Sequence, residues 1–202
     1  MAPCMSTIID QLTDLFAKLP GIGPRQARRF VYYLLKERGG VGARMSHLIS
    51  QLKSEVSQCK ECYRFHVDKS CRICVDPNRS QTSLMVVLND ADLESIERAH
   101  VHDGQVFVLG GYVSLLEDEK TGKPKYARLT ELTARIGKMH QLTEIILAFA
   151  ANQDGDHTAY YLRDYLMQPG LTITTLGRGL STGSELEYAD ADTIKSALLG
   201  RH

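Results

Sequence analysis

Apolar positions in the first quarter of the chain recur at helical spacing. They run through residues 8–19, resume over 27–35 and return over 45–56. The prolines and glycines of segment 20–24 predict a tight turn, and Pro24 suits the first position of the second helix. Three helices are therefore expected. The second should bury a face made of Ala27, Phe30, Val31, Leu34 and Leu35.

After the last clustered cysteine, short apolar runs alternate with helical periodicity. Strands are predicted at 84–88, 106–109, 144–149 and 171–176, and helices at 93–99, 129–139, 157–167 and 190–199. Apolar strands between helices are typical of a parallel sheet with helices on both faces. The fold class is α/β, with an N-terminal helical hairpin domain and a small cysteine-containing element before the sheet. Loops at 89–92, 110–111, 150–156 and 177–183 should carry function, because they follow the carboxyl ends of strands.

Composition and charge narrow the function classes. The 202 residues are 43% hydrophobic and carry 24 basic and 24 acidic side chains, which excludes a disordered or collagen-like chain. Residues 1–80 hold 13 basic and 7 acidic side chains, so their net charge is +6, and residues 81–202 hold 11 and 17, which gives −6. The positive net charge of residues 1–80 suits a polyanionic partner. No apolar run approaches the roughly 18 residues of a membrane span, so we expect a cytoplasmic protein without a membrane partner.

The turn between the first two helices has the features of a phosphate-binding element. Gly21 and Gly23 allow a tight turn that presents bare amides at a helix N-terminus, where phosphate binds well. Arg25 and Arg29 are four residues apart and therefore share a face of the second helix. This pattern is typical of a helix-hairpin-helix that reads the DNA backbone without sequence preference. The alternative is a helix turn with a solvated basic face.

Four of the five cysteines have metal-ligand spacing. Cys59 and Cys62 form one C-x-x-C pair, and Cys71 and Cys74 form a second. Four thiolates complete a tetrahedral Zn²⁺ site with no open position, so one structural zinc per chain is predicted. Cys4 is the spare cysteine, and free thiols or two disulfides are the alternative. His66 could replace a cysteine as ligand, but four sulfurs already fill the site.

Acidic residues follow two of the predicted strands. Asp154 and Asp156 have the D-x-D spacing that can hold Mg²⁺, and Asp90 or Asp92 could assist after the first strand. Alternatively, this D-G-D is a turn in which Asp156 caps a helix that begins at His157. His157 itself is interpreted as a surface residue of that helix, because one imidazole makes no metal site.

Motifs along nearly the whole chain occur in the order and spacing of one family. They are Leu19-Pro20-Gly21-Ile22-Gly23-Pro24, the four cysteines with Asp76-Pro77-x-Arg79, Val108-Leu109-Gly110-Gly111, Asp154-Gly155-Asp156-x-Thr158-Ala159, Arg178-Gly179-Leu180 and Gly183-x-Glu185-Leu186-Glu187-Tyr188-Ala189-Asp190. With these motifs the chain resembles the RecR family of recombination mediator proteins. The chain departs from the family at Asn89, where the family has a glutamate, and in the polar segment 117–125.

The resemblance implies four parts: a helix-hairpin-helix DNA-binding domain at 1–56, a Cys4 zinc finger at 57–80, a Toprim domain at 81–176 and a C-terminal oligomerisation segment at 177–202. It implies a homo-oligomer, a dimer or tetramer, that forms a ring around DNA and works with RecO and RecF to load RecA. The DNA partners that it implies are gapped, duplex and single-stranded DNA. Arg25 and Arg29 match the basic positions that touch the duplex, and Asp154 and Asp156 match positions that engage RecO. A cytoplasmic, nucleoid-associated protein is implied.

The place of Asn89 bears on catalysis. An amide cannot exchange a proton near neutral pH, so a phosphoryl-transfer reaction would lose its most plausible acid/base group unless Asp90 or Asp92 substitutes for it. We therefore expect a non-catalytic DNA-binding mediator. The alternative is a Mg²⁺-dependent Toprim nuclease or topoisomerase-like enzyme that uses Asp90, Asp154 and Asp156.

Overall fold

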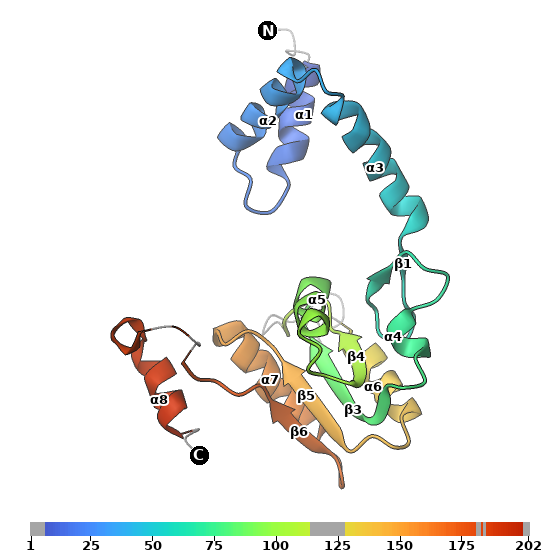
Figure 1. The fold of residues 1–202 in the computed structure, drawn as a ribbon, viewed down its shortest axis with the longest axis vertical. Coiled ribbons are helices and arrows are strands. Elements are labelled where there is room, and N and C mark those ends of the chain that lie inside the picture. The colour runs from blue at the N-terminus through green and yellow to red at the C-terminus, as the bar shows by residue number, and fades with distance from the viewer. Residues whose placement is uncertain (1–6, 114–127, 181–182, 184, 200–202) are drawn as a thin grey trace, which may run out of the picture. The chain divides into compact units, whose positions relative to one another are not determined.

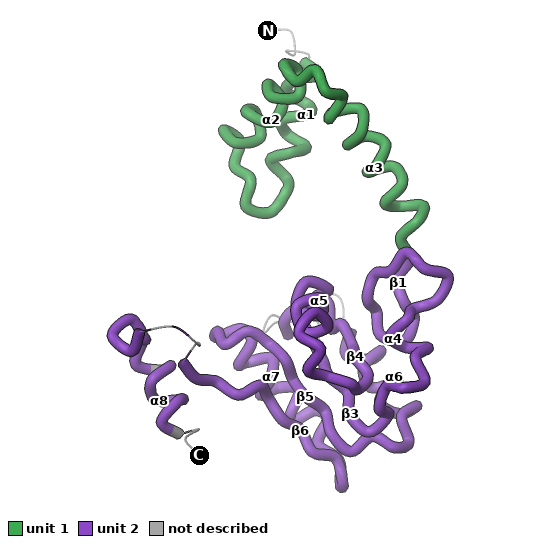
Figure 2. The backbone as a smooth tube through the Cα atoms, in the orientation of Figure 1, with its two compact units in different colours: residues 1–56 green, residues 57–202 purple. Residues whose placement is uncertain are grey.

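The computed structural model describes residues 7–113, 128–180, 183 and 185–199, so the polar segment 117–125 lies outside the described residues. The chain divides into two compact units, Met1–Val56 and Ser57–His202 (Figure 2). Within the described ranges, no helix is both long and apolar enough to cross a membrane.

Three helices form the first unit, as predicted: α1 (Ile8–Ala17), α2 (Pro24–Lys36) and α3 (Val41–Glu55) (Figure 1). Thr7 begins α1 with a capping box, in which its hydroxyl accepts from the Asp10 amide and the Asp10 carboxylate accepts from the Thr7 amide. Pro24 begins α2, because a proline at the first helical position loses no intrahelical hydrogen bond.

Helices α1 and α2 pack against each other through a small apolar interface. Ala27 and Val31 of α2 are buried, and the rings of Phe16 and Phe30 meet edge to face with centroids 6.0 Å apart. The expectation that Leu35 is buried is wrong: its side chain is 63% exposed, because it lies to one side of the face that meets α1. Helix α3 exposes its apolar side chains, and none of its residues is buried.

The second unit contains a four-stranded parallel sheet in the order β4-β3-β5-β6. Its strands are β3 (Ser80–Val87), β4 (Gly104–Val108), β5 (Glu144–Ala148) and β6 (Thr172–Thr175), and its helices are α5 (Asp90–Ala99), α6 (Leu129–Lys138) and α7 (Gln153–Leu166). A 3₁₀ helix (Leu186–Tyr188) and α8 (Ala191–Leu199) follow β6. The predicted alternation of strands and helices is confirmed, with strand ends shifted by a few residues.

Successive residues of the central strand β3 point to opposite faces of the sheet. Leu84 and Val86 join the apolar cluster that α6 and α7 cover, whereas Met85 and Val87 join the cluster that contains Leu93 of α5. Both faces are therefore buried, which explains why the strands are apolar at successive positions. The cysteine-containing element belongs to the second of these clusters.

Candidate functional site

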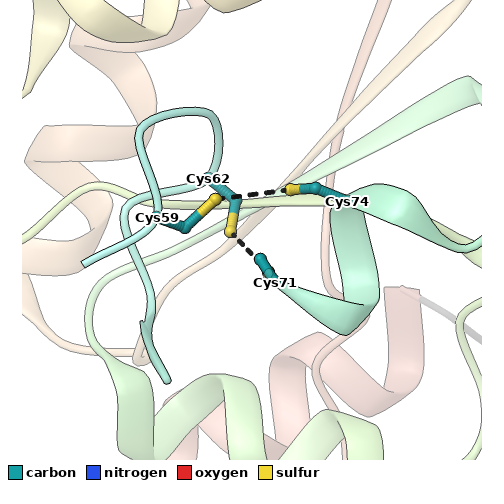
Figure 3. A group of neighbouring side chains, drawn as sticks. All are labelled: Cys59, Cys62, Cys71 and Cys74. Atoms are coloured by element: carbon teal, nitrogen blue, oxygen red, sulfur yellow. Dashed lines mark hydrogen bonds between the residues drawn. The ribbon is translucent and has the colours of Figure 1, made fainter. Parts of the chain in front are cut away.

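Four cysteine sulfurs come together beside the sheet (Figure 3). Cys59 and Cys62 lie between the short antiparallel strands β1 (Ser57–Gln58) and β2 (Phe65–His66), and Cys71 and Cys74 lie at the start of and within α4 (Arg72–Val75). The four Sγ atoms all lie within 4.8 Å of one another. Sγ of Cys59 is 3.8 Å from that of Cys74, and Sγ of Cys62 is 3.6 Å from that of Cys71.

These distances fit a tetrahedral metal ion. A zinc ion bound by four thiolates at about 2.3 Å separates the sulfurs by about 3.8 Å. All four cysteines are free of disulfides, and three of them are buried. The cluster is therefore compatible with a structural metal such as zinc, and four protein ligands leave no coordination position for a substrate.

The cysteine thiols differ in acidity. A hydrogen bond from Cys62 lowers the pKa of Cys74 to about 6, and the positive charge of Arg135 acts in the same direction. The same hydrogen bond, and then burial, raises the pKa of Cys62, while burial raises the pKa of Cys71. Four thiolates at this spacing would repel one another, so a bound cation is needed to hold them deprotonated together.

The cysteine-containing element is fixed to the sheet by backbone and side-chain contacts. The carbonyl of Cys62 accepts a 2.8 Å hydrogen bond from the amide of Val108 on β4. Glu61 accepts from Arg135 at 3.0 Å and from Lys138 at 2.9 Å, both on α6. These hydrogen bonds, that from Lys138 above all, hold the pKa of Glu61 below its ordinary value.

His66 takes no part in the cysteine cluster. Its Nδ1 lies 2.9 Å from the carbonyl oxygen of Asp68, and the group of possible metal ligands in the described residues contains only the four cysteines. The interpretation that four sulfurs suffice is consistent with this geometry.

The turn between α1 and α2 leads into a basic helix face. Gly21 adopts a φ of +76°, a left-handed conformation that favours glycine, and Gly23 precedes α2 without a side chain to cap it. The first amides of α2 therefore have no side-chain acceptor from the cap. Arg25 and Arg29 are exposed, and neither forms an ion pair or hydrogen bond with a described residue. Arg28, in contrast, pairs with Asp10 at 3.3 Å.

The D-G-D segment lies inside a helix instead of in a loop. The Asn152 side chain caps α7 by accepting a 2.8 Å hydrogen bond from the Gly155 amide, so α7 begins at Gln153. The expectations of a loop over 150–156 and of Asp156 as the cap are both wrong. A Cβ at residue 155 would lie 2.1 Å from the carbonyl oxygen of Ala150, which explains the glycine between the two aspartates.

The acidic residues do not form one site. Asp156 pairs with Arg178, which follows β6, and this hydrogen-bonded pair lowers the pKa of Asp156. Asp154 is exposed. Asp90 accepts a 2.8 Å hydrogen bond from the Phe65 amide and so holds β2 against α5. Asn89 caps α5 by accepting from the Asp92 amide at 3.0 Å.

Sequence reasoning missed two contacts at these positions. Glu61 and Arg135 are 74 residues apart, and no local pattern links them. Arg178 lies in the predicted loop 177–183 and only its place after β6 pointed to it, as the carboxyl ends of parallel strands β5 and β6 lie at the same edge of the sheet.

Three family models match the chain. "RecR, helix-hairpin-helix" matches residues 9–53, "Toprim domain" matches 82–177 and "RecR, C-terminal" matches 179–202. Curated relatives match over 96% of the chain. Proteins named "Recombination protein RecR" from Jannaschia sp. and Rhodopseudomonas palustris are each 37% identical, over 95% and 94% of their own lengths. That from Chloroflexus aggregans is 38% identical over 92% of its length.

Proposed function

Because this chain belongs to the RecR family of recombination proteins, we propose that it is a non-catalytic mediator that binds DNA through the turn between α1 and α2. The observation that carries the proposal is a pair of exposed arginines on α2, Arg25 and Arg29, which have no ion-pair partner in the part of the chain that the structure describes. They follow the Gly21–Gly23 turn within two helical turns, and the cap before them supplies no side-chain acceptor for the first amides of α2. Both kinds of group bind phosphate oxygens without reading bases.

The four-cysteine cluster supports a structural role within this function. We propose that it holds one Zn²⁺ per chain, since its sulfur spacing and lack of an open position suit that ion. A bound ion would supply charge neutralisation for the thiolates. The surrounding residues would hold the cysteine-containing element in place, because Val108 and Glu61 connect the element to β4 and α6.

The acidic residues of the Toprim domain support a mediator better than an enzyme. Two of the three carboxylates are engaged separately, Asp90 with the Phe65 amide and Asp156 with Arg178, and Asp154 is exposed. Asn89 has the role of a helix cap and carries no carboxylate. A Mg²⁺-dependent nuclease would need these groups around one cation, so that alternative is not favoured.

The partners proposed for the chain follow from its family resemblance. We propose that copies assemble through the C-terminal segment 177–202 into a ring, either a dimer or a tetramer, that encloses DNA. The assembled protein would act with RecO, and with RecF, to load RecA on gapped DNA in the nucleoid. Asp154 and Asp156, at the first turn of α7, are the proposed contact for RecO.

The decisive experiment is the oligomer mass of the purified protein with and without gapped DNA, measured by light scattering at two salt concentrations. A closed multimer that retains DNA at low salt and loses it steeply as salt rises is expected, because phosphate contacts release counterions. A monomer that binds DNA equally well, or a multimer that ignores DNA, would contradict the proposal.

A further inference from the structure

The face of α2 that carries Arg25 and Arg29 also carries a tyrosine and a lysine. At about 100° per residue, Lys36 lies within about 20° of Arg25 around the helix, and Tyr32 lies within about 20° on the other side. Arg29, at about 40°, completes a stripe at positions i, i+4, i+7 and i+11. The four residues of this α2 stripe are all exposed. They span about 16 Å along the helix, or several nucleotides of a DNA strand.

The α2 stripe lies opposite the packed side of the helix. Ala27 and Val31, which are buried, point about 160° and 120° away from Arg25. Arg28, which pairs with Asp10, lies outside the stripe. The ion pair and the ring contact between α1 and α2 therefore involve residues outside the stripe.

Tyr32 is the unusual member of the stripe. It is 47% exposed, and it makes neither a hydrogen bond nor a ring contact with any residue in the described part of the chain. Phe30, two residues earlier, shows the contrast, because its ring packs against Phe16. Tyr32 therefore presents a half-exposed aromatic ring between two cations, Arg29 and Lys36.

The chemistry of that arrangement separates two kinds of DNA. Cations bind the phosphates of any strand, whether paired or not. An aromatic ring gains from stacking only where a base face is free, and in an intact duplex the neighbouring base pairs cover those faces. A cationic stripe interrupted by one free ring suits a strand that carries unstacked bases.

We infer that Tyr32 stacks on an unpaired base while Arg25, Arg29 and Lys36 bind the flanking phosphates, so that α2 distinguishes gapped or single-stranded DNA from continuous duplex. This inference rests on the proposed DNA-binding function and adds a substrate preference to it. The aromatic ring at residue 32 then determines which form of DNA is preferred, whereas the turn contacts the phosphate backbone of any form.

The test measures the affinity of the full-length protein for three fluorescein-labelled probes: a duplex, the same duplex with a single-strand gap, and a single strand. Tyr32→Ala should weaken binding to the gapped and single-stranded probes by about 5- to 100-fold, the range for loss of one stacked base. Binding to the duplex should change by less than about twofold, because the phosphate contacts remain. Alanine suits a helix and Tyr32 is half exposed, so the fold should persist.

Two further variants make the result specific. Tyr32→Phe keeps the ring and should retain the preference for gapped DNA. Tyr160→Ala removes a more exposed tyrosine, 68% exposed on α7, and should leave all three affinities unchanged. Circular dichroism and the oligomer mass are measured for every variant.

Each outcome decides between the inference and the function on which it rests. Where the wild-type protein binds DNA, three results for Tyr32→Ala would overturn the role of Tyr32. They are an equal loss of affinity for all three probes, no loss of affinity, and a change of oligomer mass in place of a change of preference. Absence of DNA binding in the wild-type protein would overturn both the proposed function and this inference.

Discussion

Glu61, which stands between the clustered Cys59 and Cys62, accepts a 3.0 Å hydrogen bond from Arg135 of α6. Arg135 is 13% exposed, and its guanidinium also donates at 3.0 Å to the buried Gln105 of β4. One arginine thus joins the cysteine-containing element, a helix and a strand. The metal site and the sheet are therefore expected to lose stability together.

The first prediction concerns this arginine. A double-mutant cycle of Glu61→Ala and Arg135→Ala should give a coupling of about 1–3 kcal/mol in the free energy of unfolding, since the bond is charged and partly buried. The matching cycle with Lys138→Ala should give less than about 1 kcal/mol, because Lys138 is 62% exposed. Urea unfolding measures both, and equal couplings would show that the burial of Arg135 does not matter.

The second prediction concerns pH. The pKa of Asp156 in the folded chain lies below its ordinary value of 3.8, because Arg178 hydrogen-bonds to the carboxylate. The stability from this group is fully present above pH 3.8 and is lost as the pH falls through the folded-state pKa. The pair is exposed, so Asp156→Asn should cost less than about 1 kcal/mol above that value. Urea midpoints of the two proteins should converge on acidification; a constant difference would argue against the ion pair.

The third prediction concerns the metal. The purified chain should contain one zinc ion, and Cys62→Ser should lose it and lower the free energy of unfolding by more than about 3 kcal/mol, because a buried ligand is removed. Cys4→Ser is the control and should retain the metal. Elemental analysis and thermal unfolding provide the measurements. A full zinc content in Cys62→Ser would remove this cysteine from the ligand set.

The fourth prediction concerns the arginines of α2. Arg25→Ala combined with Arg29→Ala should weaken binding to every DNA probe, because two phosphate contacts are lost. The log–log slope of the binding constant against salt should fall by about 1.8 for the duplex and by about 1.4 for the single strand. Arg28→Ala is a matched control from the same helix and should change the slope less, since Arg28 pairs with Asp10. Titrations at several salt concentrations give the slope, and an unchanged slope in the double variant would exclude these arginines from DNA contact.

The fifth prediction concerns Asn89. Asn89→Ala should destabilise the protein by about 1 kcal/mol, because the Asp92 amide loses its acceptor at the start of α5. Asn89→Asp keeps an acceptor oxygen at this position and should stay within a few tenths of a kcal/mol of the wild type. Urea unfolding compares them. A larger loss in Asn89→Asp than in Asn89→Ala would show that the cap is not what this residue supplies.

The fold was largely predictable because its signals are local. Helical spacing identified the three N-terminal helices, and the apolar strands identified a sheet buried on both faces. The start of α7 was not predicted: Asn152 caps the helix four residues earlier than the apolar spacing begins, and Gly155 fits there only because of the close carbonyl of Ala150.

The cysteine cluster was predictable for the same reason, since each pair of ligands is close in sequence. The contacts that fix the cluster to the sheet were not, because Glu61, Arg135 and Val108 meet only after folding. The separate engagement of Asp90 and Asp156 was equally hidden. Spacing alone suggested a shared cation for these carboxylates, but their partners come from β2 and from the segment after β6.

The hydrogen bond between the Cys62 carbonyl and the Val108 amide has a consequence for self-association. Strand β4 is the last strand on its side of the sheet, and an open strand of that kind can recruit a strand from another molecule. The cysteine-containing element covers part of this sheet edge. If the proposed ion is removed, the chain is therefore expected to aggregate, and chelation should show first as turbidity at high protein concentration.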